Sequence, residues 1–133
     1  KVKDSKSAGE LADKITKRRL NWLSENKSLL REDLSLPEAA YRLLLYDHMK
    51  VNGGTTIEMI TPNLMKAKVG NFCPYLEACK ILDMDTKFVC KEIGEPSIVA
   101  FFKAINPKLN FFRDYNRIRP YSDYCLEFAE VTQ

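Results

Sequence analysis

The sequence predicts an α+β fold, with N-terminal helices, a helical middle, and a small antiparallel sheet that includes a C-terminal β-hairpin. Three observations support this fold class. Apolar residues recur with a helical period near the N-terminus, short β-branched or alternating segments follow, and the last part of the chain changes to a period of two. A chain of 133 residues has the size of one domain, placed here over residues 1–133. Its 45% hydrophobic and 29% charged residues are typical of a packed globular protein.

Two helices are expected near the N-terminus. The first is indicated by apolar residues that share one helical stripe, namely Leu11, Ile15, Trp22 and Leu29. We expect it to end near Arg31. In the second helix Ser35 is placed to cap the first turn, Pro37 suits that turn, and Glu38 follows at the spacing of a capping box. The NGG sequence at residues 52–54 should end this helix.

The next segments, TTIEMI at residues 55–60 and LMKAKVG at residues 64–70, have β-branched or alternating character. They predict two short strands, or one bent strand, with Pro62 and Asn63 as the break. Three helices should follow. Their expected ranges are Pro74–Leu82, Thr86–Ile93 and residues 95–105, the last with Pro96 in its first turn and Asn106 and Pro107 as its stop.

The C-terminal hairpin is expected from residues 108–118 and 124–131, joined by the turn-rich sequence RPYSD. Alternation along these strands places Arg113 and Tyr115 on one face of the first and Cys125 and Glu127 on one face of the second. Side chains of this kind could line a pocket with a polar floor. The alternative is a set of cross-strand ion pairs on a solvent-exposed face.

Charge and hydropathy argue against nucleic acid and membrane partners. The net charge is +3, and the basic run KITKRR lies within a helical pattern, so a solvated helix face is expected there rather than a phosphate-binding face. An interaction protein that uses this basic helix is a third functional class. The longest apolar run, IVAFF, is too short for a membrane span. No secretion signal is visible, so we expect a cytoplasmic protein.

Four cysteines, Cys73, Cys79, Cys90 and Cys125, follow the pattern C-x5-C-x10-C-x34-C. The pattern has none of the C-x2-C pairs of zinc ribbons, but four thiolates would suit Zn or an iron–sulfur cluster. Reduced, unligated thiols and disulfides are the other two interpretations. Cys73 should be the most reactive thiol because Pro74 would place it at a helix N-cap. Cys79 and Cys90 are expected in the core.

The single histidine, His48, falls on an apolar helix face, which favours a histidine at the edge of the core that is bonded to the backbone. A pair of Cys73 and His48 requires the second helix to lie over the third, and the sequence leaves that arrangement open.

The runs CPYLEACKILDMDTKFVC, NPKLNF and RDYNRIRPYSDYCLEF together resemble the C-terminal half of the L-2-amino-thiazoline-4-carboxylic acid hydrolase family. The resemblance covers about residues 71–130. It rests on a C-P-x4-C element, a further cysteine about a dozen residues later, a strand with a basic end, and a closing strand with Asp123 and Cys125. Phe128 departs from the family pattern by one position.

The resemblance implies the opening of a cyclic amidine, in which water adds to the ring C=N carbon and the ring nitrogen leaves to give an S-carbamoyl thiol. Such a reaction needs an activated nucleophile or a metal-bound water, a proton donor, and a cation for the substrate carboxylate. The candidate catalytic residues are Cys73, Asp123 and Glu127, and the candidate ligand-binding residues are Arg113, Tyr115, Arg117 and His48. We therefore expect a hydrolase-like protein for a small carboxylated ligand near the cysteines. The alternative is a non-catalytic module that binds a small ligand or a metal.

Overall fold

The computed structural model describes residues 5–132, so residues 1–4 and 133 of the predicted domain lie outside the described residues. The elements are α1 (Ser5–Asn26), η1 (Lys27–Leu29), α2 (Leu36–Arg42), η2 (Leu43–His48), β1 (Thr55–Thr61), β2 (Leu64–Val69), α3 (Pro74–Leu82), α4 (Thr86–Val89), η3 (Cys90–Gly94), α5 (Glu95–Ile105), β3 (Leu109–Asp114) and β4 (Cys125–Val131). The predicted α+β class is confirmed. In the part of the chain that is described, no helix combines the length and apolar character needed to span a bilayer.

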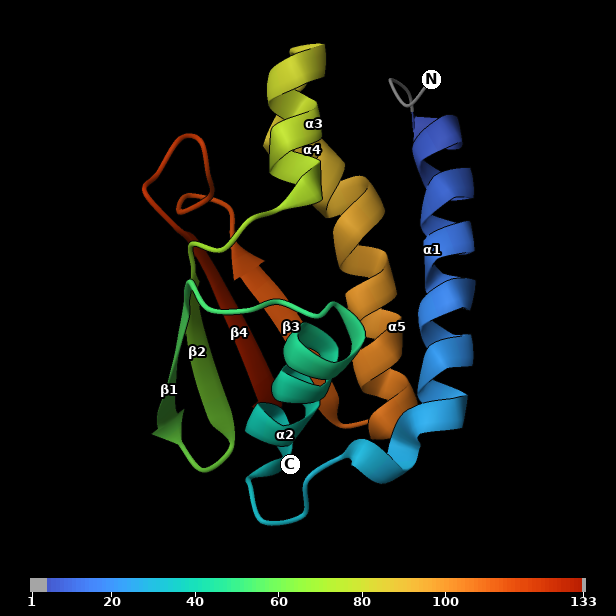
Figure 1. The fold of residues 1–133 in the computed structure, drawn as a ribbon, viewed down its shortest axis with the longest axis vertical. Coiled ribbons are helices and arrows are strands. Elements are labelled where there is room, and N and C mark those ends of the chain that lie inside the picture. Colours follow the sequence, from blue (N-terminus) through green and yellow to red (C-terminus); the bar gives the residue numbers. More distant parts are fainter. Residues whose placement is uncertain (1–4, 133) are drawn as a thin grey trace.

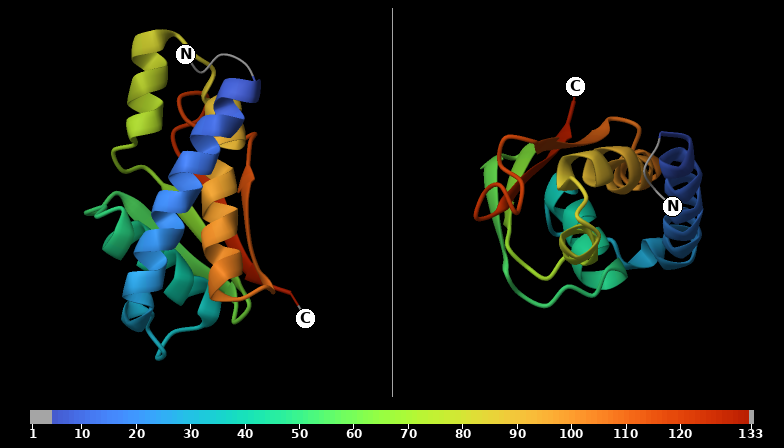
Figure 2. Two further views of the ribbon diagram at one scale, coloured as in Figure 1. Left: turned by 90° about the vertical axis from the view of Figure 1, so that its right-hand side faces the viewer. Right: turned by 90° about the horizontal axis from the view of Figure 1, so that it is seen from above.

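The sheet is antiparallel, with the strand order β1-β2-β4-β3, so the C-terminal strand β4 lies between its hairpin partner β3 and the earlier hairpin of β1 and β2. Helices α2 and α5 cover one face of this sheet, and α1 packs against α5 on the side away from the sheet (Figures 1 and 2). The register pairs Arg113 of β3 with Glu127 of β4, and Val69 of β2 with Cys125 of β4. The sheet therefore brings polar residues from the C-terminal hairpin beneath the helical layer.

The central core lies between the sheet and α2, η2 and α5. Its largest fully buried side chains include Tyr41, Phe101, Phe102, Met65 and Leu109. A second, smaller cluster joins the start of α1 to α3, α4 and η3 through Ala8, Cys79, Val89 and Ile93. Cys79 thus lies in a cluster separate from the central core, as a small buried hydrophobic residue.

Ser35 is the N-cap residue of α2, as expected, but the predicted capping box does not form. The Ser35 hydroxyl contacts the Met59 sulfur at 3.7 Å and makes no capping hydrogen bond. Glu38 instead accepts a hydrogen bond of 2.8 Å from Nε of Arg42, which lies one turn further along α2. The Glu38 carboxylate therefore pairs with a charged side chain on the same helix face and not with the backbone N–H of Ser35.

The prediction of two separate helices between residues 86 and 105 is wrong, because α4, η3 and α5 follow one another without a break. The backbone of Gly94 is helical, with φ −72° and ψ −48°, and the Glu95 N–H donates to the carbonyl of Cys90 in a π-turn. Pro96 has no N–H to donate, and its ring would clash with the carbonyl four residues earlier in a regular α-helix. The wider π-turn just before Pro96 lets the helix continue.

Strand β3 ends at Asp114, four residues before the end of the predicted strand. Tyr115 and Arg117 therefore belong to the loop between β3 and β4 instead of the sheet. The Arg117 N–H donates to the carbonyl of Asp114 at 2.9 Å, and the Asp114 carboxylate accepts from the N–H of Asn116 at 2.9 Å. These turn bonds end the strand at Asp114 because the aspartate side chain bonds to the backbone two residues later.

Candidate functional site

A cavity of about 80 Å³ lies between the sheet and the helical layer. Its volume is several times the roughly 10–15 Å³ that one water molecule requires. Apolar side chains such as Leu44, Leu45 and Ile98 form much of its wall. Its polar lining consists chiefly of Arg19, Tyr41, Cys73, Cys90, Arg113, Arg119, Cys125 and Glu127. Both π-helical segments contribute to the wall, η2 through the two leucines and η3 through Cys90 and Gly94.

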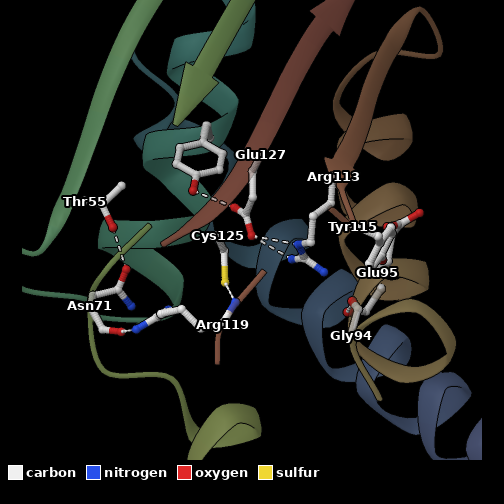
Figure 3. Close-up of polar contacts among 11 residues, drawn as sticks. Thr55, Asn71, Gly94, Glu95, Arg113, Tyr115, Arg119, Cys125 and Glu127 are labelled. Atoms are coloured by element: carbon white, nitrogen blue, oxygen red, sulfur yellow. Dashed lines mark hydrogen bonds and ion pairs between the residues drawn. The ribbon is translucent and has the colours of Figure 1, made fainter. Parts of the chain in front are cut away.

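The ion pair of Arg113 and Glu127 forms one side of this cavity (Figure 3). Nε and Nη2 of Arg113 donate to Oε2 of Glu127 at 3.1 and 2.7 Å, and the Tyr41 hydroxyl donates to Oε1 at 2.7 Å. The two charged side chains are only 8% and 10% exposed. The pocket with a polar floor is therefore present, and the alternative of cross-strand ion pairs on a solvent-exposed face is wrong for this pair. Sheet register places Arg113 opposite Glu127, and α2 supplies Tyr41 from above.

Electrostatics keep the Arg113 guanidinium charged. Burial alone would lower the pKa of Arg113. The neighbouring Glu127 carboxylate raises this pKa, and together with the other nearby groups it outweighs burial, so the net shift is upward. Burial, reinforced by the Glu127 charge, raises the pKa of Tyr41 and keeps its hydroxyl a proton donor. Nη1 of Arg113 is buried and has no hydrogen-bond partner among the described residues. A buried cationic N–H without a partner is costly, so this atom is a candidate point of contact for a ligand.

Arg119 lies on another side of the same cavity and was not among the residues predicted from the sequence. Its Nη1 donates to the carbonyl of Asn71 at 2.8 Å, and its backbone N–H donates to the Cys125 sulfur at 3.4 Å (Figure 3). Its Nε is buried without a partner among the described residues. The sequence placed Arg119 in a turn and carried no signal that this turn folds back onto the cavity.

Asn71 is held in place by a close approach of two loops. Gly54 has φ +84°, and a Cβ at this position would lie 2.8 Å from Cα of Asn71, so a side chain cannot be accommodated. The Gly70 N–H donates to the Gly54 carbonyl at 2.8 Å, and the Thr55 hydroxyl donates to the side-chain oxygen of Asn71. These contacts lie at the mouth of the cavity, where residues 49–54 face Asn71, Phe72 and Pro74.

Three of the four cysteines, Cys73, Cys90 and Cys125, line the cavity, whereas Cys79 lies in the second core cluster. All four are free thiols. In the described part of the chain, no three His, Cys, Asp or Glu side chains are grouped as metal ligands would be. The observed geometry therefore does not bring the four candidate metal ligands together.

The thiols differ in their surroundings. Cys73 is the N-cap of α3, as expected, and is partly exposed. Burial raises the pKa of Cys90 to about 12, and burial also raises the pKa of Cys79, so both remain protonated at neutral pH. Cys125 accepts the hydrogen bond from the Arg119 backbone.

We expect iodoacetamide to alkylate Cys73 faster than Cys79 and Cys90. The thiolate is the reactive form, Cys73 is partly exposed, and burial suppresses the thiolates of Cys79 and Cys90. Mass spectrometry of the native protein after short alkylation times at mildly alkaline pH would give the four rates, with the urea-unfolded chain as the control in which all sites are open. Equal, slow labelling at all four positions would remove Cys73 as a candidate nucleophile.

The other predicted site residues lie outside this cavity. Asp123 and Arg117 are exposed in the loop between β3 and β4. The Tyr115 hydroxyl hydrogen-bonds the Glu95 carboxylate, and burial followed by this bond raises its pKa. The ring of Tyr115 lies beside Arg113, with 5.9 Å between the ring centre and the guanidinium carbon. Tyr115 itself does not line the cavity.

His48 occupies the predicted position at the edge of the core. Its ring lies 4.7 Å from that of Trp22 and 6.1 Å from that of Phe101, between centroids. Burial and the nearby charge of Arg19 lower its pKa, and its Nδ1 has no hydrogen-bond partner among the described residues, so the expected backbone bond is not seen at that atom. No contact joins His48 to Cys73 among the interactions of the described residues.

Tyr41 was also missed, although the sequence holds a signal for it. It lies in the apolar part of α2, and a fully buried tyrosine normally finds a partner for its hydroxyl. The partner, Glu127, is distant in the sequence and could not be named without the sheet.

Comparison of the chain with protein-family models, with curated proteins and with solved structures finds no match. The functional argument therefore depends on the geometry of the cavity.

Proposed function

We propose that this protein binds a small carboxylated molecule in the cavity, and that it acts on a cyclic amidine or a related thiol-derived metabolite as a hydrolase. The observation that carries the proposal is the buried guanidinium of Arg113, which lines the cavity and whose Nη1 has no partner within residues 5–132. A carboxylate oxygen at Nη1 would form the charge-assisted hydrogen bond that this atom lacks. The largely apolar wall would accept the ring of the ligand.

The proposed hydrolysis forms one bond between water oxygen and the amidine carbon and breaks the bond from that carbon to the ring nitrogen. The water oxygen becomes a carbonyl oxygen as the ring nitrogen leaves, both protons of the water end on that nitrogen, which becomes an amine, and these transfers need an acid–base group near both atoms. Of the two candidates predicted from the sequence, Glu127 lines the cavity and Asp123 does not. Glu127 is therefore our candidate for the proton transfer, and Cys73, which also lines the cavity, is the candidate nucleophile if a covalent intermediate forms.

A non-catalytic module that binds the same class of ligand is the alternative, since the same Arg113 contact would serve it. Turnover separates the two functions. A cyclic amidine carboxylate of the thiazoline type incubated with the protein should be converted into one open-chain product that carries both a thiocarbamate and a free amine if the chain is a hydrolase, whereas a binding module would return the ligand unchanged.

Replacing Arg113 with lysine should weaken the binding of a carboxylated ligand by about tenfold to a hundredfold. Lysine keeps a positive charge beside Glu127, but it lacks the planar guanidinium, which can donate hydrogen bonds to Glu127 and to a ligand carboxylate at the same time. Calorimetry against a small panel of thiazoline and cysteine-derived carboxylates would measure this loss. The exposed pair of Arg31 and Asp33 offers the control, because Arg31→Lys changes the same group on the surface. A confirmed ligand that binds Arg113→Lys as tightly as the wild type would place the carboxylate elsewhere.

A further inference from the structure

The cavity carries more positive than negative charge. Three arginines line it, Arg19, Arg113 and Arg119, and Glu127 is the single carboxylate among its described lining residues. Arg19 is bonded through Nε to the Ser97 hydroxyl at 2.8 Å, which is a neutral partner. One of the three guanidinium charges is therefore balanced by Glu127, and two have no anionic counterpart in the wall.

The mouth continues this charge pattern. A second, more open hollow adjoins the cavity and shares with it Met49, Asn71, Phe72 and Pro74. Among the described residues that line this hollow, Lys50 is the one that carries a charge. A ligand that enters here passes from one cationic region to another, and such a path favours anions because fields of one sign add in a cleft with apolar walls.

Two of these cations have an unused donor. Nη1 of Arg113 and Nε of Arg119 are both buried, and neither has a hydrogen-bond partner among the described residues. Their side chains come from different segments, Arg113 from β3 and Arg119 from the loop before β4, and the Cys125 side chain lies between them (Figure 3). A wall with two separate unpartnered cationic donors is suited to a ligand with two acceptor groups.

Arg119 is fixed in position before any ligand binds. Its Nη1 is held by the Asn71 carbonyl, its backbone N–H by the Cys125 sulfur, and its own carbonyl accepts a 2.7 Å hydrogen bond from the buried Thr86 hydroxyl. Three contacts to three different segments hold this loop residue against the cavity. A donor fixed in this way loses little conformational freedom on binding and adds affinity for that reason.

We propose that the ligand carries two anionic groups, one bound at Arg113 and the other at Arg119, so that the cavity selects small dianions of the dicarboxylate class over monocarboxylates. This inference rests on the proposed carboxylate-binding function and narrows its ligand class. Arg119 is then the residue that determines specificity for the second anionic group.

The test compares succinate with succinamate, in which an amide replaces one carboxylate on the same carbon skeleton. NMR titration of the backbone amides at slightly alkaline pH suits the weak affinities expected of such minimal probes. The wild-type protein should bind succinate about tenfold or more tightly than succinamate, because the second charge gains a charge-assisted hydrogen bond at Arg119. This first comparison needs no substitution and does not depend on the folding of a variant.

The variant Arg119→Gln should abolish most of the preference for succinate while leaving succinamate binding within about twofold, since it removes the charge at the second anion position and leaves Arg113 in place. Arg31→Gln removes the same charge from an exposed position and should leave both affinities as they are. Equal binding of both probes by the wild type, with the shifted amides beside Arg113, would overturn the dianion inference and leave the proposed function standing. No saturable binding of these probes or of the thiazoline carboxylates would overturn both.

Discussion

Replacing Arg113 with methionine is expected to lower the free energy of unfolding by about 3–5 kcal/mol, the range for removal of one partner from a buried ion pair. Methionine fills much of the same space, but it leaves the Glu127 carboxylate buried with only the Tyr41 hydroxyl as its partner. Urea denaturation followed by circular dichroism would measure the change. Arg31→Met is the matched control, because it breaks an arginine–aspartate pair in which both side chains are more than half exposed, and it should change stability by less than about 1 kcal/mol.

The double variant Arg113→Met, Glu127→Met separates an unpaired charge from lost packing. If the stranded carboxylate causes most of the destabilisation, removing it should restore a large part of the loss, since apolar replacements of a buried pair are often nearly neutral. A double variant as unstable as Arg113→Met alone would mean that packing around the arginine stem dominates. A loss under about 1 kcal/mol in the single variant would contradict the burial of the pair.

The second large effect is expected at Phe101. Its ring is fully buried, and it contacts Trp22, His48 and Phe102, so it joins the helical layer at the centre of the core. Phe101→Ala should destabilise the protein by about 3–5 kcal/mol through lost transfer free energy and the cavity left behind. Phe112→Ala provides the control on the opposite face of the sheet, where the ring is 42% exposed and stacks on Phe128, and its effect should be clearly smaller.

The same substitution has a second readout at His48. Burial is the main cause of the lowered pKa of this imidazole, so opening the space beside it should raise the pKa towards its ordinary value near 6.5. In the wild type the unfolded chain binds the proton more readily than the folded one, and the contribution of His48 to stability therefore falls as the pH drops below about 6.5. NMR titration of the imidazole would report the shift. An unchanged pKa in a folded Phe101→Ala variant would assign the effect to Arg19 and the other nearby cations instead.

Local signals predicted most elements of this fold. The capping position of Ser35, the proline at the start of α3 and the alternation in β1, β2 and β4 all depend on neighbouring residues, and the structure agrees with each. The errors occur where tertiary contacts decide. Pro96 normally marks a helix start, yet the π-turn before it lets one helix run through, and nothing local in the sequence distinguishes these outcomes.

The cavity could be predicted only in part, for the same reason. Alternation along the hairpin correctly placed Arg113, Cys125 and Glu127 on one face, because a strand has a fixed period of two. The roles of Tyr41 and Arg119 depend on contacts across 86 and 48 positions of the chain, with Glu127 and Asn71 respectively. No periodicity reports on such distances. For Arg117, a strand was expected where the chain forms a loop, and Asp123 lies in the segment that was expected to join the two strands; both side chains lie on the surface.

The π-turn of η3 accommodates one extra residue within the helix, directly before Pro96. Thr86, before this turn, bonds to the carbonyl of Arg119, and Cys90, its first residue, lines the cavity; after the turn, Phe101 and Phe102 lie in the core. Deleting the exposed Lys91 would remove the extra residue and with it the wide turn, so that the ring of Pro96 would meet the carbonyl four residues before it and the helix would have to kink or break there. Either the cavity wall or the core would then lose its side chains. Surface loops of this chain can vary in length without that consequence, whereas this helical segment tolerates substitution far better than any change in residue number.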